Sequence, residues 1–135
     1  MLTVKIYSFS YKKSGIPKDD TPNMGGFVFD CRFIYNPGRK EEFKTLTGKD
    51  KVVRDFLDND SSMQHFLKNV YEIIDSAVDN FTGRDFTSLM VSFGCTGGQH
   101  RSVYAAESLN SHLKNKYNGK IGLVLRHMEL QSLSF

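Results

Sequence analysis

The chain has 135 residues, of which 39% are hydrophobic and 24% are charged. This length and composition predict one soluble globular domain over residues 1–135, with a core that needs neither disulfides nor metal, and they exclude a disordered chain. The formal charge of +3 permits an anionic ligand but is too small for a dedicated nucleic-acid-binding protein.

The cysteine content and the amino terminus indicate the compartment. Two cysteines, Cys31 and Cys95, are too few for a disulfide framework, and the chain does not begin with the pattern of a secretory signal. No apolar stretch approaches the roughly 18 residues that a membrane-spanning helix needs. We therefore expect a cytoplasmic protein without a membrane partner. No Cys/His spacing suggests zinc, so we expect no cofactor.

The first part of the chain is predicted to contain two strands. Partial alternation of apolar and polar residues over 2–11 predicts a strand, and the polar stretch 12–26, with its prolines and glycines, predicts a loop. The apolar run 27–34 predicts a second strand. Asp30 and Arg32 interrupt that run and would share one face of the strand.

Two helices are predicted to follow. Residues 51–57 suggest a short helix, and a longer one is indicated up to about Gly83 by apolar residues at helical spacing. For the longer helix, Ser61 is the predicted N-cap, with Gln64 as its capping-box partner.

The last part of the chain predicts a βαβ unit. Residues 86–93 read as a buried strand, 102–117 as a helix, and 121–125 as a final strand. Such a crossover is right-handed and joins parallel strands. The predicted fold class is therefore α/β: a single domain with a mixed or mostly parallel sheet, flanked by helices, that ends in a βαβ unit.

A glycine-containing turn connects the first strand of this unit to its helix. Main-chain amides at a helix amino terminus lack partners within the helix, and together with the helix dipole they favour an anion. Gly97 and Gly98 allow close approach of the main chain, and Arg101 adds a planar cation suited to phosphate. A plain strand-to-helix turn is the simpler alternative, but this combination of residues favours an anion site. The predicted site residues are Cys95, Thr96, Gly97, Gly98, Gln99, His100, Arg101 and Ser102.

An enzymatic alternative rests on the same turn. Cys95, five intervening residues, Arg101 and Ser102 resemble the signature loop of the cysteine-dependent phosphatases, in which a thiolate attacks phosphorus. Asp30 is the candidate general acid for such a reaction. Those loops usually carry histidine before the cysteine, whereas this chain has Gly94. We favour a buried Cys95 that closes a strand, and hence binding without catalysis.

Four stretches, in order along nearly the whole chain, resemble the C-terminal domain of RapZ-type proteins. They are Ser8–Phe9 through Gly15–Pro17, Phe29–Phe33 with Asn36–Pro37, Leu46–Asp50, and Gly94–Val103 followed by Arg126–His127. The resemblance implies an α/β domain that binds a phosphosugar, glucosamine-6-phosphate in the best-known members, and in those members also a small regulatory RNA. It further implies a homo-oligomer or a separate nucleotide-binding partner chain.

Three departures limit what the resemblance implies. The chain has no Gly-x-x-x-x-Gly-Lys-Ser/Thr segment, so we expect no NTPase activity. Gly38 stands where relatives often carry a histidine or aromatic residue of the ligand pocket, which leaves the identity of the sugar open. The chain ends in residues 128–135 without the basic cluster of RNA-binding relatives, which makes an RNA-binding adaptor the lesser hypothesis.

Three further residues complete the predicted site. Asp30 and Arg32 in a buried run would be costly unless they pair with each other or with a ligand. We expect Asp30 to accept sugar hydroxyls or orient Arg101, and Arg32 to supply charge for phosphate. His127 ends the last strand and could reach the same pocket, although a histidine bonded to the backbone is an equal alternative. The sequence thus predicts a regulatory or sensor domain for a phosphorylated small molecule or an inorganic anion.

Overall fold

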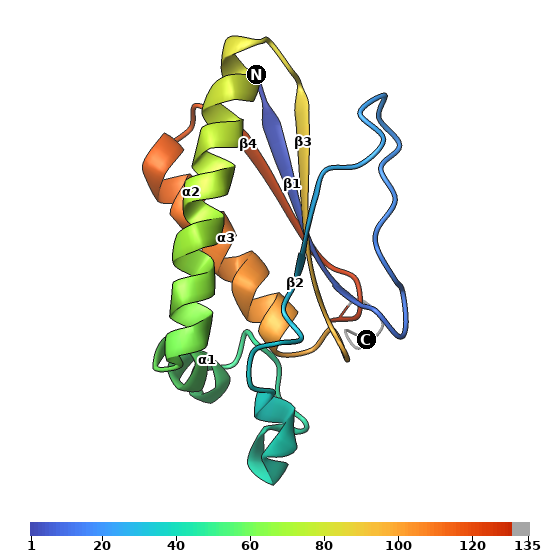
Figure 1. The fold of residues 1–135 in the computed structure, drawn as a ribbon, viewed down its shortest axis with the longest axis vertical. Helices are drawn as coiled ribbons and strands as arrows, with labels where there is room; N and C mark the ends of the chain where they lie inside the picture. Colours follow the sequence, from blue (N-terminus) through green and yellow to red (C-terminus); the bar gives the residue numbers. More distant parts are fainter. Residues whose placement is uncertain (131–135) are drawn as a thin grey trace.

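The computed structural model describes residues 1–130 as an α/β fold. The elements follow in the order β1 (Thr3–Ser10), β2 (Phe27–Asp30), the 3₁₀ helices η1 (Pro37–Arg39) and η2 (Glu41–Phe43), α1 (Lys51–Asp58), α2 (Ser61–Gly83), β3 (Ser88–Cys95), α3 (Arg101–Tyr117) and β4 (Gly122–His127) (Figure 1). The predicted α/β class and the C-terminal βαβ unit are confirmed.

The four strands of the described region form one sheet in the order β2-β3-β1-β4. All three strand pairs are parallel, so the sheet is wholly parallel where the sequence allowed a mixed one. Because the strands run in one direction, their carboxyl ends meet at one edge of the sheet. Ligands of open α/β sheets bind outside this edge.

The core lies between the sheet and the helices. Helices α2 and α3 lie on one side of the sheet, and the loop of residues 11–26 runs along the other side (Figure 1). All eight residues of β3 are buried, as expected for a central strand. Val4 and Ile6 of β1, with Leu109 and Leu113 of α3, are fully buried in the same hydrophobic cluster. This packing fixes the position of the turn that joins β3 to α3.

Two local predictions are wrong. The N-cap of α2 is Asp60 rather than Ser61, because the Asp60 side chain accepts a hydrogen bond from the main-chain N of Met63. Gln64 does not form a capping box, since its Nε2 donates to the Leu57 carbonyl oxygen and to the hydroxyl of Tyr104.

Strand β2 is also shorter than the predicted run 27–34. It ends at Asp30, whose Oδ1 accepts a hydrogen bond of 2.8 Å from the main-chain N of Arg32. An Asp that binds the backbone two residues ahead forms a turn in place of a continued strand. Asp30 and Arg32 therefore flank a turn and do not share a strand face.

Candidate anion site at the β3–α3 turn

The turn between β3 and α3 presents free main-chain amides at the carboxyl edge of the sheet. Within the described chain, none of the main-chain N–H groups of residues 97–101 donates a hydrogen bond. Gly98 adopts φ +67°, and a Cβ there would lie 2.5 Å from Cγ of Glu129. By contrast, Gly97 has open space where a side chain would begin. Gly98 thus packs the turn against the protein, while Gly97 faces free space.

A pocket of about 430 Å³ opens at this turn. It is lined by Asn36, Gly38, Lys44, Cys95, Thr96, Gly97, Gln99, His100 and Arg101. Of the predicted turn residues, only Gly98 and Ser102 are outside this lining. Asn36, Gly38 and Lys44 were not among the predicted site residues. The Asn36–Pro37 pair within the family resemblance was a usable signal for Asn36, whereas no local sequence pattern marks Lys44.

The turn holds the segment from Phe43 to Gly48, from which Lys44 lines the pocket. Gln99 Nε2 donates to the carbonyl oxygens of Lys44, at 2.8 Å, and Leu46, at 2.6 Å. His100 Nε2 donates to the carbonyl oxygen of Phe43, at 2.8 Å. Gln99 and His100 therefore shape the pocket by fixing its wall.

Arg101 is almost completely buried, with 4% of its surface exposed. Its Nη1 donates to the carbonyl oxygens of Arg32, at 2.9 Å, and Ile34, at 2.7 Å. These bonds tie the turn after β2 to the amino terminus of α3. Arg101 is among the residues that line the pocket, and its guanidinium has a structural role as well, since it satisfies the buried carbonyl group of Ile34 and the partly buried one of Arg32.

Cys95 ends β3 with 2% of its surface exposed. Its Sγ lies 3.1 Å from Oγ of Ser102 in the first turn of α3. A side chain cannot replace the hydrogen of Gly94, because a Cβ there would lie 2.4 Å from the Phe9 ring and 2.6 Å from the Tyr11 ring. The histidine that precedes the phosphatase cysteine therefore has no room in this fold.

Asp30 and Arg32 form an exposed ion pair of 2.7 Å outside the pocket lining. The hydrogen bond from Arg32 lowers the pKa of Asp30 below its ordinary value. The Arg32 guanidinium also stacks 3.8 Å from the centre of the Tyr11 ring. The two residues thus pair with each other, one of the two arrangements expected from the sequence, but they are exposed rather than buried because β2 ends at Asp30. The carboxylate is bound by Arg32 and does not orient Arg101.

His127 lies on β4 and does not line the pocket. Its Nδ1 is 2.7 Å from Oγ of Ser8, and its Nε2 donates to Glu107 at 2.6 Å. This hydrogen bond lowers the pKa of Glu107 below its ordinary value. These two bonds hold the His127 ring between β1 and α3, away from the pocket lining.

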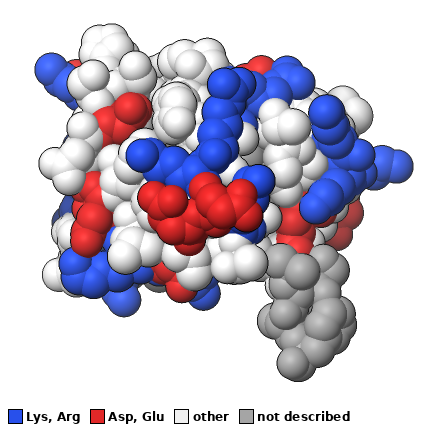
Figure 2. Space-filling model, turned by 90° about the horizontal axis from the view of Figure 1, so that it is seen from below, with Lys and Arg blue, Asp and Glu red and all other residues white. Residues whose placement is uncertain are grey.

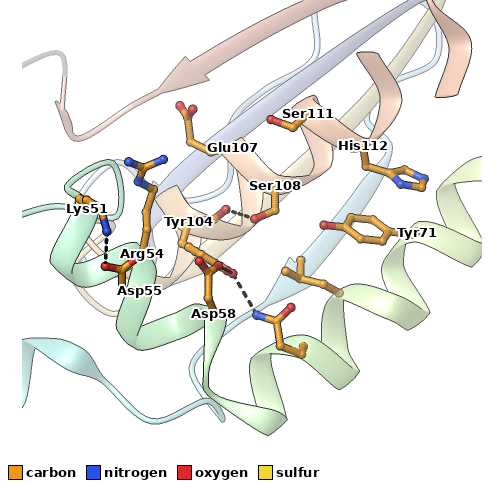
Figure 3. Close-up of a pocket in the computed structure, with 12 residues that line it drawn as sticks. Lys51, Arg54, Asp55, Asp58, Tyr71, Tyr104, Glu107, Ser108, Ser111 and His112 are labelled. Carbon is orange, nitrogen blue, oxygen red and sulfur yellow. Dashed lines mark hydrogen bonds and ion pairs between the residues drawn. The ribbon is translucent and has the colours of Figure 1, made fainter. Parts of the chain in front are cut away.

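A larger groove of about 690 Å³ lies between α1, α2 and α3 (Figure 3). Tyr104 forms its centre, since the Tyr104 hydroxyl donates to Asp58 and accepts from Gln64 Nε2. Burial, more than the bond to Asp58, raises the pKa of Tyr104 above its ordinary value. Lys51 pairs with Asp55 along the rim at 2.7 Å. Because the polar groups around Tyr104 bind one another, their hydrogen bonds link the three helices.

On the face shown in Figure 2, positively and negatively charged side chains form separate small groups. In the view of Figure 2, from below Figure 1, groups of Lys and Arg alternate with Asp and Glu. This face therefore lacks the continuous basic stripe of a nucleic-acid-binding surface. Among residues 1–130, no three His, Cys, Asp or Glu side chains are grouped as metal ligands. No helix in this part of the chain is long and apolar enough to cross a membrane.

Comparison with known proteins identifies related sequences. Residues 2–131 match the family described as RapZ C-terminal domain. A nucleotide-binding protein of Shewanella halifaxensis is 34% identical over 131 residues, which are 97% of this chain and 43% of the relative. One from Fervidobacterium nodosum is 38% identical over 127 residues, 94% of this chain and 43% of the relative. The chain thus spans about two-fifths of the length of these relatives.

Proposed function

Because the chain belongs to the RapZ C-terminal domain family, we propose that it is a regulatory or sensor domain that binds a phosphorylated small molecule or an inorganic anion. The observation that carries this proposal is the run of unpaired amides over 97–101 beside a pocket at the amino terminus of α3. Such amides and the helix dipole stabilise negative oxygen atoms without any further cation. Arg101 and Lys44 add positive charge at the same pocket.

The other lining residues support a ligand that carries hydroxyl groups beside its phosphate. Asn36 Oδ1 accepts a hydrogen bond from the main-chain N of Gly38, which leaves the Asn36 amide NH₂ for a ligand. Thr96, which carries a hydroxyl, is another residue of the same lining. A phosphosugar, as in the best-known members of the family, fits these groups. Nucleoside phosphates belong among the test ligands because the relatives are named nucleotide-binding proteins.

Calorimetry with inorganic phosphate, glucosamine-6-phosphate and nucleoside phosphates tests this proposal. We expect Gly97→Asp to abolish binding, because its carboxylate would stand in the anion site while open space at Gly97 preserves the fold. Gly97→Ala is the matched control, and we expect it to retain most of the affinity. Arg101→Ala should also abolish binding, but it removes two hydrogen bonds to carbonyl groups and should lower the melting temperature as well. Equal affinity of Gly97→Asp and the unaltered protein would refute the site.

One contact favours a second candidate, a cysteine-dependent phosphatase. Ser102 Oγ lies 3.1 Å from Cys95 Sγ, where it could stabilise a thiolate. The candidate acid Asp30 is held by Arg32 instead. This hypothesis predicts hydrolysis of an aryl phosphate that Cys95→Ser eliminates and Cys31→Ala, at the other buried cysteine, preserves. Turnover no faster than the buffer alone would leave binding as the function of the pocket.

A further inference from the structure

The outer edge of β4 offers unpaired main-chain groups. In the sheet formed by the described residues, β4 is outermost and pairs with β1 alone. The main-chain N–H groups of Gly122 and Met128 donate to β1. Because main-chain groups point to alternate sides along a strand, those of Leu123, Leu125 and His127 point away from β1. An edge of this kind presents donors and acceptors to another chain.

An apolar groove of about 420 Å³ lies between β4 and α3. Its apolar side chains come from alternate positions at and before β4 and from one position of α3, namely Ile121, Leu123, Leu125 and Leu113. Leu123 and Leu125 are only partly buried. A strand added beside β4 would continue their row, so every second side chain of that strand would lie over the groove.

The segment that builds this edge carries only positive charges. Residues 108–128 contain no Asp or Glu. Lys114 lines the groove, Lys120 precedes β4, and Arg126 lies near the end of the strand. All three side chains are exposed, and none of the ion pairs within residues 1–130 involves them. Charge complementarity therefore calls for an acidic partner.

We propose that the outer edge of β4 binds an extended acidic segment of a different protein as an added strand. The main chain of that segment pairs with the outward groups of β4. Its apolar side chains, at alternate positions, lie over the groove beside Leu123 and Leu125. The acidic side chains between them face the opposite side of the sheet, where Arg126 alternates with these leucines.

The chemistry of the edge favours this occupant over two others. A nucleic acid has no peptide groups to pair with a strand, and the groove lining contains no aromatic ring for a base to stack on. A second copy of this chain would bring its own Lys120 and Arg126 to an edge that already carries these cations.

Fluorescence anisotropy of a labelled peptide tests the edge in the full chain. The probe has about eight residues of alternating valine and glutamate, enough to span β4. We expect it to bind, and Lys120→Glu combined with Arg126→Glu to weaken binding at least about tenfold, because attraction becomes repulsion. Lys68→Glu combined with Arg39→Glu is the matched control, since it changes the net charge equally at exposed positions of α2 and η1. No binding of the probe, or an equal loss in the control, would overturn the proposal.

Two N-methylated forms of the probe test the main-chain pairing. Only every second N–H of an added strand faces β4. Methylation of all valines or of all glutamates should therefore abolish binding in one form and preserve it in the other. Equal affinity of the two forms would refute an added strand.

Three further measurements test other modes of binding. We expect that polyuridylate does not displace the probe, that Gly97→Asp binds it with unchanged affinity, and that the probe does not dissociate a dimer in light scattering. Displacement by polyuridylate would make the edge a nucleic-acid surface. Loss of binding in Gly97→Asp would place the glutamates in the anion site, and a dimer that the probe dissociates would assign the edge to a second copy. Each of these results would overturn the proposal.

Discussion

The two glycines in the turn between β3 and α3 have different structural roles. Gly97 borders the pocket with open space around it, whereas Gly98 is packed between Ser10 and Glu129 at φ +67°. Gly97 therefore leaves room for a ligand, whereas Gly98 is required by the conformation and packing of the backbone. Similarly, Gln99 and His100 shape the pocket through bonds to main-chain carbonyl groups. For a variant at any of these positions, ligand affinity and folding stability therefore have to be measured separately.

At this scale we predict opposite outcomes for the two glycines. Gly98→Ala should destabilise the protein by at least about 2 kcal/mol, because its Cβ would collide with Glu129 in an unfavourable left-handed conformation. Gly97→Ala should change the free energy of unfolding little. Urea denaturation of both variants measures the difference. Equal stability of the two would mean that the turn does not hold Gly98 as described.

At the scale of elements, short polar contacts determine where helices and strands begin and end. Asp60 begins α2 through its bond to the Met63 amide, and Asp30 ends β2 through its bond to the Arg32 amide. The carboxylate satisfies a main-chain donor in each case. The end of β2 in turn frees the carbonyl groups of Arg32 and Ile34 to accept from Arg101. A local turn thus contributes to the position of the anion site.

The start of α2 gives the prediction at this scale. Asp60→Ala should cost about 1 kcal/mol of stability because the amide of Met63 loses its acceptor. Ser61→Ala should have little effect, since Ser61 is the first residue of the helix rather than its cap. Chemical denaturation distinguishes the two positions. A larger loss for Ser61→Ala would restore Ser61 as the N-cap.

At the scale of the whole molecule, one hydrogen-bonded chain connects three elements away from the pocket. Ser8 on β1, His127 on β4 and Glu107 on α3 are bonded in that order. Ser8 is fully buried and His127 nearly so, which places these bonds inside the protein, where they connect the three elements. Because His127 donates to a carboxylate, the strength of the connection depends on pH.

The lowered pKa of Glu107 gives the sign of this dependence. The stabilisation is complete above the ordinary pKa of 4.5 and is lost as pH falls through the lower pKa of the folded state. Glu107→Gln should therefore lower the melting temperature most near neutral pH, and the difference should shrink on acidification. Glu42→Gln, at an exposed carboxylate of η2, is the control and should show no such trend. A difference independent of pH would contradict the assignment.

The sequence by itself determined the class of fold and the location of the turn. Periodicity reports burial along a single element, and helix and strand patterns predicted the βαβ unit over 86–125. The motif at 95–102 stood out because its glycines and its arginine lie close together in the sequence, directly before a predicted helix. These features are local, so the sequence displays them directly.

Only the tertiary structure decided which distant residues join the turn. The strand order places His127 beside Ser8 and Glu107, and the packing of residues 43–48 on the turn brings Lys44 to the pocket wall. Neither follows from local pattern, because strand order and the docking of an irregular segment depend on contacts between residues far apart in the chain. The all-parallel sheet likewise follows from how β1 and β2 pair with strands later in the sequence.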